Sequence, residues 1–139
     1  MQSRHVSCVI AASPSEVYVF ASVPENLPLW AAGLAGADVE RDGELLRVES
    51  PMGLVTVRFA PPNDFGVLDH DVTLPTGAVV NNPLRVVAHP GGAEVVFTVR
   101  QLDLPDADFE RDCASVAEDL GRLKRILEVR PPREDKRDG

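Results

Sequence analysis

The sequence predicts an α+β fold in which one antiparallel sheet packs against a long C-terminal helix. Between residues 39 and 102, apolar and polar residues alternate in short segments separated by glycine- and proline-containing turns, as in strands joined by hairpins. Between residues 106 and 128, apolar residues recur at alternating spacings of four and three, which places them on one face of a helix. A further strand and two short helical segments are predicted before both regions.

The chain begins with a predicted strand and a well-marked helix start. Residues 4–11 alternate apolar and polar side chains, which is typical of a strand with one buried face. Ser13 can cap the following helix, a proline occupies its first position, and Glu16 stands where a capping box requires an acid. We expect this helix to end before Pro24, because proline interrupts a helix. The side chains expected on its buried side are Val17, Phe20 and Ala21.

Residues 24–34 are expected to form a second, shorter helical piece. It carries two prolines, so it should be irregular around Pro28, yet it is too apolar for an exposed loop. It also holds Trp30, the only tryptophan of the chain. This indole either lies at the rim of a pocket, as a lid, or fills the core, and the sequence favours neither interpretation.

Six strand candidates follow between residues 39 and 102. Consecutive strands with short turns between them build an antiparallel sheet. Together with residues 4–11 this predicts about seven strands. The turns that separate the six candidates are Asp42-Gly43, Met52-Gly53, Pro61 to Asp64, Pro75 to Gly77, and Pro90 to Gly92.

The last helix is predicted from Asp106 to Glu128. Acidic residues crowd its N-terminal half and basic residues its C-terminal end, and both biases suit the helix dipole. Glu118 and Arg122 have the spacing of a surface ion pair. Gly121 is unfavourable within a helix, and we expect it to allow close packing against the two short helices. The apolar stripe consists of Phe109, Cys113, Val116, Leu120, Leu123 and Leu127.

Residues 1–128 are expected to form a single domain, and residues 129–139 a disordered tail. A chain of 139 residues is long enough for one full core, and its 44% hydrophobic and 26% charged residues are close to the globular average. The tail is charged, contains two prolines and lacks periodic apolar residues. The sequence contains no internal repeat.

Charge and composition argue against several classes of partner. The net charge of −8 disfavours nucleic acids and anionic membrane surfaces. No apolar run approaches the length of a membrane span, and the N-terminus lacks the apolar core of a signal peptide, so we expect a cytoplasmic protein. Cys8 and Cys113 do not have metal-ligand or CxxC spacing, and we interpret them as buried reduced thiols.

This order of elements resembles the helix-grip fold of the START and Bet v 1-like (SRPBCC) superfamily, most closely its small bacterial polyketide cyclase/dehydrase-like members. The segment IAASPSEVYVFASVPENLPLW at 10–30 resembles the opening of these proteins, and DFERDCASVAEDLGRLKRILE at 108–128 resembles their C-terminal helix. The resemblance implies a curved sheet that grips the last helix, with a cavity between them for a hydrophobic or amphipathic small molecule. The superfamily includes carriers and enzymes, so the fold alone does not select a function.

Strand alternation identifies the side chains that would face such a cavity. The apolar set of each strand is expected to point inward. His70, Asn82 and Gln101 share this set, whereas Asp69 and Asp71 point to the opposite face. The expected ligand-binding residues, with one each from the second helical piece and the last helix, are Trp30, Phe59, His70, Asn82, Leu84, Phe97, Gln101 and Leu120.

His70 is the candidate catalytic residue if the protein is an enzyme. It would act as general acid or base, with Asn82 or Gln101 orienting a carbonyl. The simpler alternative is a hydrogen-bonded core histidine and a turn asparagine, and a bulge at Pro83 would redirect Asn82. The run Asp69 to Asp71 is not expected to bind a metal, because alternation separates the histidine from both carboxylates. HExxH, GxSxG, P-loop and GxGxxG motifs are absent, so we expect no metal and no cofactor.

Three functions are compatible with the sequence. The leading hypothesis is binding of a lipid-like or polycyclic small molecule in the cavity. The second is a metal-independent enzyme of the cyclase or dehydratase kind, acting on a polyketide-like substrate. The third is an interaction module with a filled core, and the chain could be a monomer or a homodimer in any of these cases.

Overall fold

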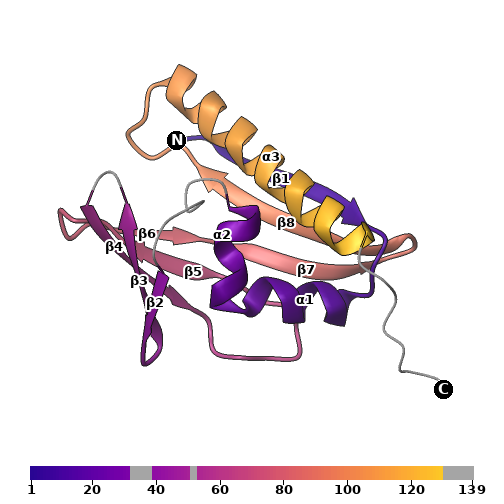
Figure 1. Ribbon diagram of the computed structural model, residues 1–139. Coiled ribbons are helices and arrows are strands. Elements are labelled where there is room, and N and C mark those ends of the chain that lie inside the picture. Colours follow the sequence, from indigo (N-terminus) through magenta and orange to yellow (C-terminus); the bar gives the residue numbers. More distant parts are fainter. Residues whose placement is uncertain (32–38, 51–52, 130–139) are drawn as a thin grey trace.

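The computed structural model describes residues 1–31, 39–50 and 53–129 and shows a sheet, two short helical segments and one long helix (Figure 1). The elements are, in chain order, β1 Ser3–Ile10, α1 Pro14–Ser22, η1 Pro24–Asn26, α2 Leu27–Trp30, β2 Val39–Asp42, β3 Leu45–Ser50, β4 Gly53–Phe59, β5 His70–Thr73, β6 Val79–Asn82, β7 Leu84–His89, β8 Gly92–Arg100 and α3 Asp106–Val129.

All pairs among the described strands are antiparallel. One group of strands has the order β1-β8-β7 and the other the order β2-β3-β4-β5-β6. The two groups join where β6 continues into β7 through Pro83, so the eight described strands form one curved sheet. The sequence predicted about seven, because residues 78–89 were expected to form one strand. Pro83 has no N–H and interrupts the ladder, although its carbonyl still accepts a hydrogen bond from the Thr98 N–H at 3.0 Å.

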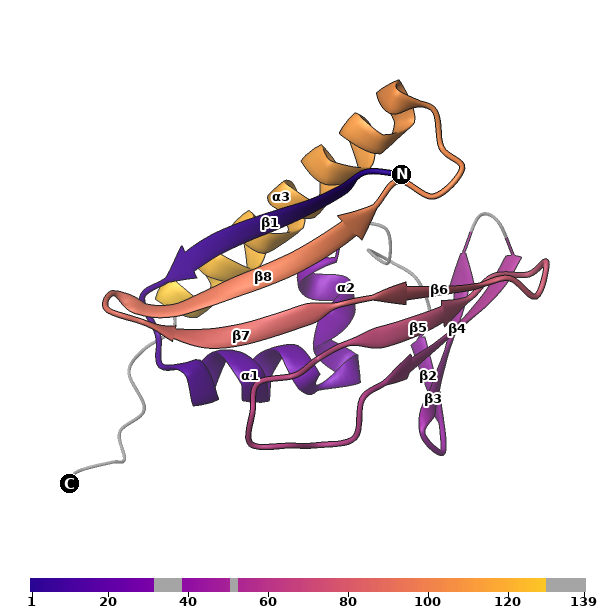
Figure 2. The same cartoon turned by 180° about the vertical axis from the view of Figure 1, so that it is seen from behind.

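The helices cover one face of the sheet. α3 runs along β1 and β8, while α1 and α2 lie over β7 and the neighbouring strands (Figure 1). Seen from behind, the strands lie in front of all three helices (Figure 2). The core therefore lies between the concave face of the sheet and the helices. Its largest fully buried side chains are Phe109, Ile10, Leu84, Leu120, Leu123, Val17, Val48 and Val95.

The start of α1 has the predicted capping box. The Ser13 hydroxyl accepts a hydrogen bond from the Glu16 N–H at 3.2 Å, and the Glu16 carboxylate accepts one from the Ser13 N–H at 3.1 Å. α1 ends at Ser22, before Pro24, as expected. Val17 and Ala21 are buried against the sheet.

β1 and α3 are joined at both of their ends. At one end the Arg4 guanidinium donates two hydrogen bonds of 2.7 Å to the Glu110 carboxylate. At the other end the Glu128 carboxylate accepts a hydrogen bond from the Ala11 N–H at 2.8 Å. The Lys124 ammonium lies 2.9 Å from the Val9 carbonyl oxygen. The predicted apolar stripe of α3 is buried against the sheet, except for Val116, which is half-buried.

Two expectations for α3 need correction. Arg122 pairs with Asp119 at 2.5 Å rather than with Glu118, and it also donates to the Trp30 carbonyl oxygen at 3.2 Å. Gly121 does not pack closely on the short helices: among the described residues, an added Cβ would meet only the Arg125 guanidinium, at 3.7 Å.

α3 extends to Val129, and the rest of the predicted tail, residues 130–139, lies outside the described residues. Cys113 is buried and Cys8 partly so, and both are free thiols. Burial raises the pKa of the Cys8 thiol. None of the described helices is long and apolar enough to cross a membrane.

Candidate functional site

An aromatic and polar cluster occupies the face of the sheet that the helices cover. In the antiparallel register Phe59 lies opposite His70, and His70 lies opposite Asn82. On the neighbouring strands Leu84 lies opposite Phe97. Opposite residues of an antiparallel pair project from the same face, about 5 Å apart at Cβ. Five of the predicted ligand-binding residues are therefore brought together by β4, β5, β6, β7 and β8.

His70 is held by its backbone and by two aromatic rings. Its ring centroid lies 4.9 Å from that of Phe59 and 5.9 Å from that of Phe97. Its Nδ1 lies 3.0 Å from the Leu68 carbonyl oxygen. A carbonyl can only accept, so Nδ1 carries the proton and Nε2 of the neutral ring is left as an acceptor. No described residue forms a hydrogen bond with this Nε2.

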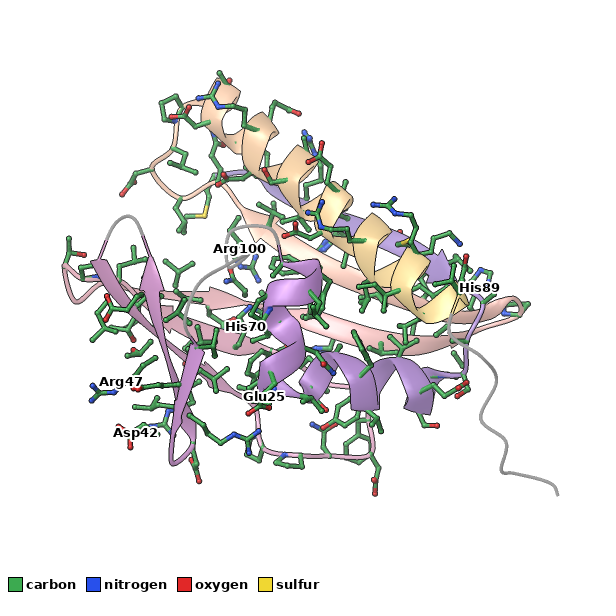
Figure 3. The ribbon with its side chains drawn as sticks, in the orientation of Figure 1. Glu25, Asp42, Arg47, His70, His89 and Arg100 are labelled. Carbon is green, nitrogen blue, oxygen red and sulfur yellow. The ribbon has the colours of Figure 1, made fainter. Side chains whose placement is uncertain are left out.

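Burial keeps the His70 imidazole neutral. Desolvation is the main cause that lowers the pKa of His70 below its ordinary value of 6.5. The Leu68 carbonyl and the carboxylates of Asp69 and Asp71 oppose this shift and do not overcome it. In Figure 3, His70 lies at the level of α2 in the middle of the molecule, whereas His89 lies at the end of the sheet where β7 turns into β8.

The two carboxylates beside His70 point to the outer face, as alternation predicted. Asp69 accepts hydrogen bonds from the Leu84 N–H at 2.9 Å and from the Arg85 guanidinium at 2.6 and 2.8 Å. Asp71 accepts one from the Asn81 amide at 2.8 Å. Within residues 1–31, 39–50 and 53–129, histidine, cysteine, aspartate and glutamate side chains form no group of three that could hold a metal ion.

Asn82 projects from the same face as His70. Exposure alternates along β6, with Asn82 half-buried and Asn81 exposed. The break at Pro83 does not reverse this pattern, since Leu84 is buried and Arg85 exposed. The Asn82 amide has no hydrogen-bond partner among the described residues. Two neighbouring polar side chains on an apolar wall thus have groups available for a ligand.

Trp30 and Leu120 belong to the core that faces this wall. Trp30 is only 4% exposed and Leu120 only 1%, and both belong to the main apolar cluster. Trp30 is therefore buried in the core of the structure. Among the buried side-chain nitrogen and oxygen atoms of the described residues, its Nε1 is the one without a hydrogen-bond partner.

Gln101 lies apart from the cluster. β8 ends at Arg100, and Gln101 begins the turn that leads to α3. Its amide nitrogen donates to the Leu104 carbonyl oxygen at 2.9 Å and to the Asp106 carboxylate at 2.7 Å. Its amide oxygen accepts from the Gln2 N–H at 3.3 Å. The side chain that alternation assigned to the wall instead stabilises the start of the last helix.

The structure also has a surface groove that the sequence did not predict. A groove of about 630 Å³ lies between α1, the loop at residues 63–66 and β7. Asn63 shapes this loop, because its amide oxygen accepts hydrogen bonds from the Phe65 and Val67 N–H groups and its own N–H donates to the Tyr18 hydroxyl. Phe65 lines the edge of this groove, and its side chain is 82% exposed. The residues from Pro61 to Asp64 predicted a turn between strands, but they did not predict the contact with Tyr18.

Comparison with known proteins establishes the fold. No protein-family model matches the chain, and no curated protein matches its sequence. Solved structures do match. Protein CV1439 from Chromobacterium violaceum is 15% identical, with a TM-score of 0.71 over 94% of this chain and 100% of that one. The Aha1 dimer from Colwellia psychrerythraea is 16% identical, with a TM-score of 0.73 over 93% of this chain and 98% of that one.

DynU16, a protein of the dynemicin biosynthetic locus, is 15% identical, with a TM-score of 0.72. The match covers 93% of this chain and 48% of DynU16, so the chain spans about half of that protein. At these identities the likeness concerns the fold. The curved antiparallel sheet, the two short helices after β1 and the long C-terminal helix define a helix-grip protein.

Proposed function

We propose that the protein binds a hydrophobic or amphipathic small molecule on the concave face of the sheet, beneath the helices, as a START/Bet v 1-like binding protein. The observation that carries this proposal is the pair His70 and Asn82. They project from opposite positions of neighbouring strands, His70 Nε2 and the Asn82 amide have no hydrogen-bond partner among the described residues, and the wall around them is otherwise apolar. A few polar groups in an apolar setting are typical of small-molecule sites.

The geometry suggests how a ligand would be held. Phe59 and Phe97 flank His70 and offer ring surfaces for an aromatic or alicyclic body. His70 Nε2 would accept a hydrogen bond from a ligand hydroxyl, and the Asn82 amide would donate or accept another. Each such bond contributes about 0.5–1.5 kcal/mol net.

Direct detection of a ligand is the first test. We expect native mass spectrometry and solvent extraction of freshly purified protein to reveal a co-purified hydrophobic compound. Titration with fluorene and 9-fluorenol, which differ by one hydroxyl, then tests the site. We expect 9-fluorenol to bind about fivefold more tightly, since it can satisfy His70 Nε2.

The two asparagines of β6 provide a matched pair of variants. Asn82→Ala removes the inward amide, whereas Asn81→Ala removes its neighbour on the outer face. We expect only Asn82→Ala to weaken binding of 9-fluorenol. Equal effects of both variants, or failure of every three-ring probe to bind, would contradict the proposal and favour an interaction module with a filled core.

A second candidate function, an enzyme of the metal-independent cyclase or dehydratase kind, is favoured by the protonation state of His70. A neutral imidazole with Nε2 available can accept a proton from a carbon acid, and Asn82 could orient a carbonyl. DynU16 comes from a biosynthetic locus, which makes biosynthetic substrates a reasonable class to screen. Once a substrate is found, His70→Ala should abolish turnover, and full activity of this variant would exclude the assignment.

A further inference from the structure

The unpaired indole N–H of Trp30 leads to a further inference about the ligand. This inference rests on the proposed small-molecule function. Trp30 is 4% exposed, and its Nε1–H has no hydrogen-bond partner. A buried donor without a partner is destabilising, and a buried tryptophan usually finds one. In the part of the chain that the structure describes, other buried side-chain nitrogen and oxygen atoms are satisfied.

The backbone around Trp30 is anchored, whereas its indole nitrogen is not. The Trp30 carbonyl oxygen accepts a hydrogen bond from Arg122 Nε at 3.2 Å, which fixes the end of α2 to α3. The indole packs in the apolar cluster that also contains Leu68 and Leu84, and Phe59 and Phe97 pack against this same cluster. The unpaired donor therefore belongs to the same core as the His70 and Asn82 wall.

We infer that Trp30 Nε1–H is a polar anchor for the ligand and donates a hydrogen bond to an acceptor oxygen such as a ketone carbonyl. Solvent does not reach Nε1 in the structure, so the ligand meets it after the indole turns. The Arg122 bond holds the backbone at Trp30, so the proposed movement is confined to the side chain. The expected ligand is therefore a largely apolar ring system with at least one carbonyl-type acceptor for Trp30. It would also carry a hydroxyl that donates a hydrogen bond to His70 Nε2.

The single tryptophan makes this inference directly measurable. Its indole N–H gives one resonance in a ¹⁵N-labelled sample, and hydrogen bonding moves the proton downfield. We propose titration with fluorene and 9-fluorenone, which have the same three-ring skeleton and differ by a carbonyl. The expected result is a downfield shift of the Trp30 indole proton with 9-fluorenone only, and about fivefold tighter binding of 9-fluorenone than of fluorene.

Three variants separate Trp30 from other donors. Trp30→Phe keeps an aromatic ring without the N–H and should remove the preference for 9-fluorenone. Asn82→Ala removes the unpaired amide of the wall and should leave the indole shift in place. Leu29→Ala, which truncates an exposed side chain on the same turn, should behave as the wild type.

The outcomes distinguish this inference from the proposed function. If both probes bind equally and the indole proton does not move downfield, the inference is overturned and the binding function stands. If neither probe binds, both are overturned. The indole shift is measured on the wild-type protein, so the test holds even if Trp30→Phe fails to fold.

Discussion

The Nδ1 atom of His70 lies 3.0 Å from the carbonyl oxygen of Leu68, two residues earlier in the chain. This contact assigns the proton to Nδ1 and leaves Nε2 as the acceptor on the concave face. The strand itself thus sets the tautomer, without help from a carboxylate. The neighbouring acids are bound to Arg85 and Asn81 on the opposite face.

The first prediction concerns the pH dependence of stability. Burial lowers the pKa of His70 in the folded state, while the unfolded chain keeps the ordinary value of 6.5. Between these two pKa values the unfolded state binds more protons, so the free energy of unfolding falls as pH decreases below about 6.5. We expect His70→Gln to reduce this slope in urea unfolding series. A His70 resonance that titrates at or above 6.5 in an NMR titration would contradict the prediction.

The second prediction concerns the Asp69 carboxylate. It binds both the Leu84 N–H and Arg85, and thereby joins the start of β5 to β7. Removal of this carboxylate leaves the Leu84 N–H unpaired, so Asp69→Ala should lower the free energy of unfolding by about 1–3 kcal/mol. The control is Asp71→Ala, which loses only a surface bond to Asn81 and should change stability by less than about 1 kcal/mol. Equal losses would show that the Leu84 contact is unimportant.

The Asp69 carboxylate also predicts a response to acid. The hydrogen bond from Arg85 is the main cause that lowers its pKa below the ordinary 3.8. Its contribution to stability is therefore present above pH 3.8 and is lost as pH falls through the lower folded value. The free energy of unfolding of Asp69→Asn should depend less on pH in this acidic range. An unchanged pH dependence, measured by chemical unfolding, would exclude this linkage.

Gly66 is expected to resist substitution. Its φ is +72°, and an added Cβ would lie 2.1 Å from the Val86 carbonyl oxygen. The Val86 N–H also donates to the Gly66 carbonyl oxygen at 2.9 Å, so a shift of the backbone would weaken this bond. Gly66→Ala should lower the free energy of unfolding by more than about 2 kcal/mol. Gly77→Ala, at a φ of +92° with open space around it, measures the backbone strain alone and should lose less.

Gly121 should give the opposite result. It lies within α3, and the described residues leave room for a methyl group. Alanine is a better helix former, so Gly121→Ala should raise the free energy of unfolding by about 0.5–1 kcal/mol. Thermal and urea unfolding would measure this gain. A loss of stability would instead support the close packing that the sequence suggested.

Local patterns were sufficient to predict much of the fold. The Ser13 and Glu16 capping box and the apolar stripe of α3 depend on neighbouring residues, so both were visible in the sequence. Alternation also placed His70 and Asn82 on one face, because the register of the strands preserves this periodicity even across Pro83.

Features that depend on strand ends and distant contacts were not predictable in this way. Alternation assigned Gln101 to the wall, but β8 ends one residue earlier, and the side chain binds Asp106. The groove beside α1 depends on a hydrogen bond between Asn63 and Tyr18, which are 45 residues apart. The unpaired nitrogen of Trp30 is likewise a property of the packed core rather than of any local pattern.

The contacts between β1 and α3 have a consequence for how the chain folds during synthesis. Arg4 and Ala11, near the start of the chain, bind Glu110 and Glu128, near its end. Such pairs have a high sequence separation, so they form late and slow the folding reaction. The apolar face of β1 is covered only after α3 has been synthesised and has left the ribosome. Until then the nascent sheet exposes that face, and transiently exposed apolar surface of this kind is prone to aggregate.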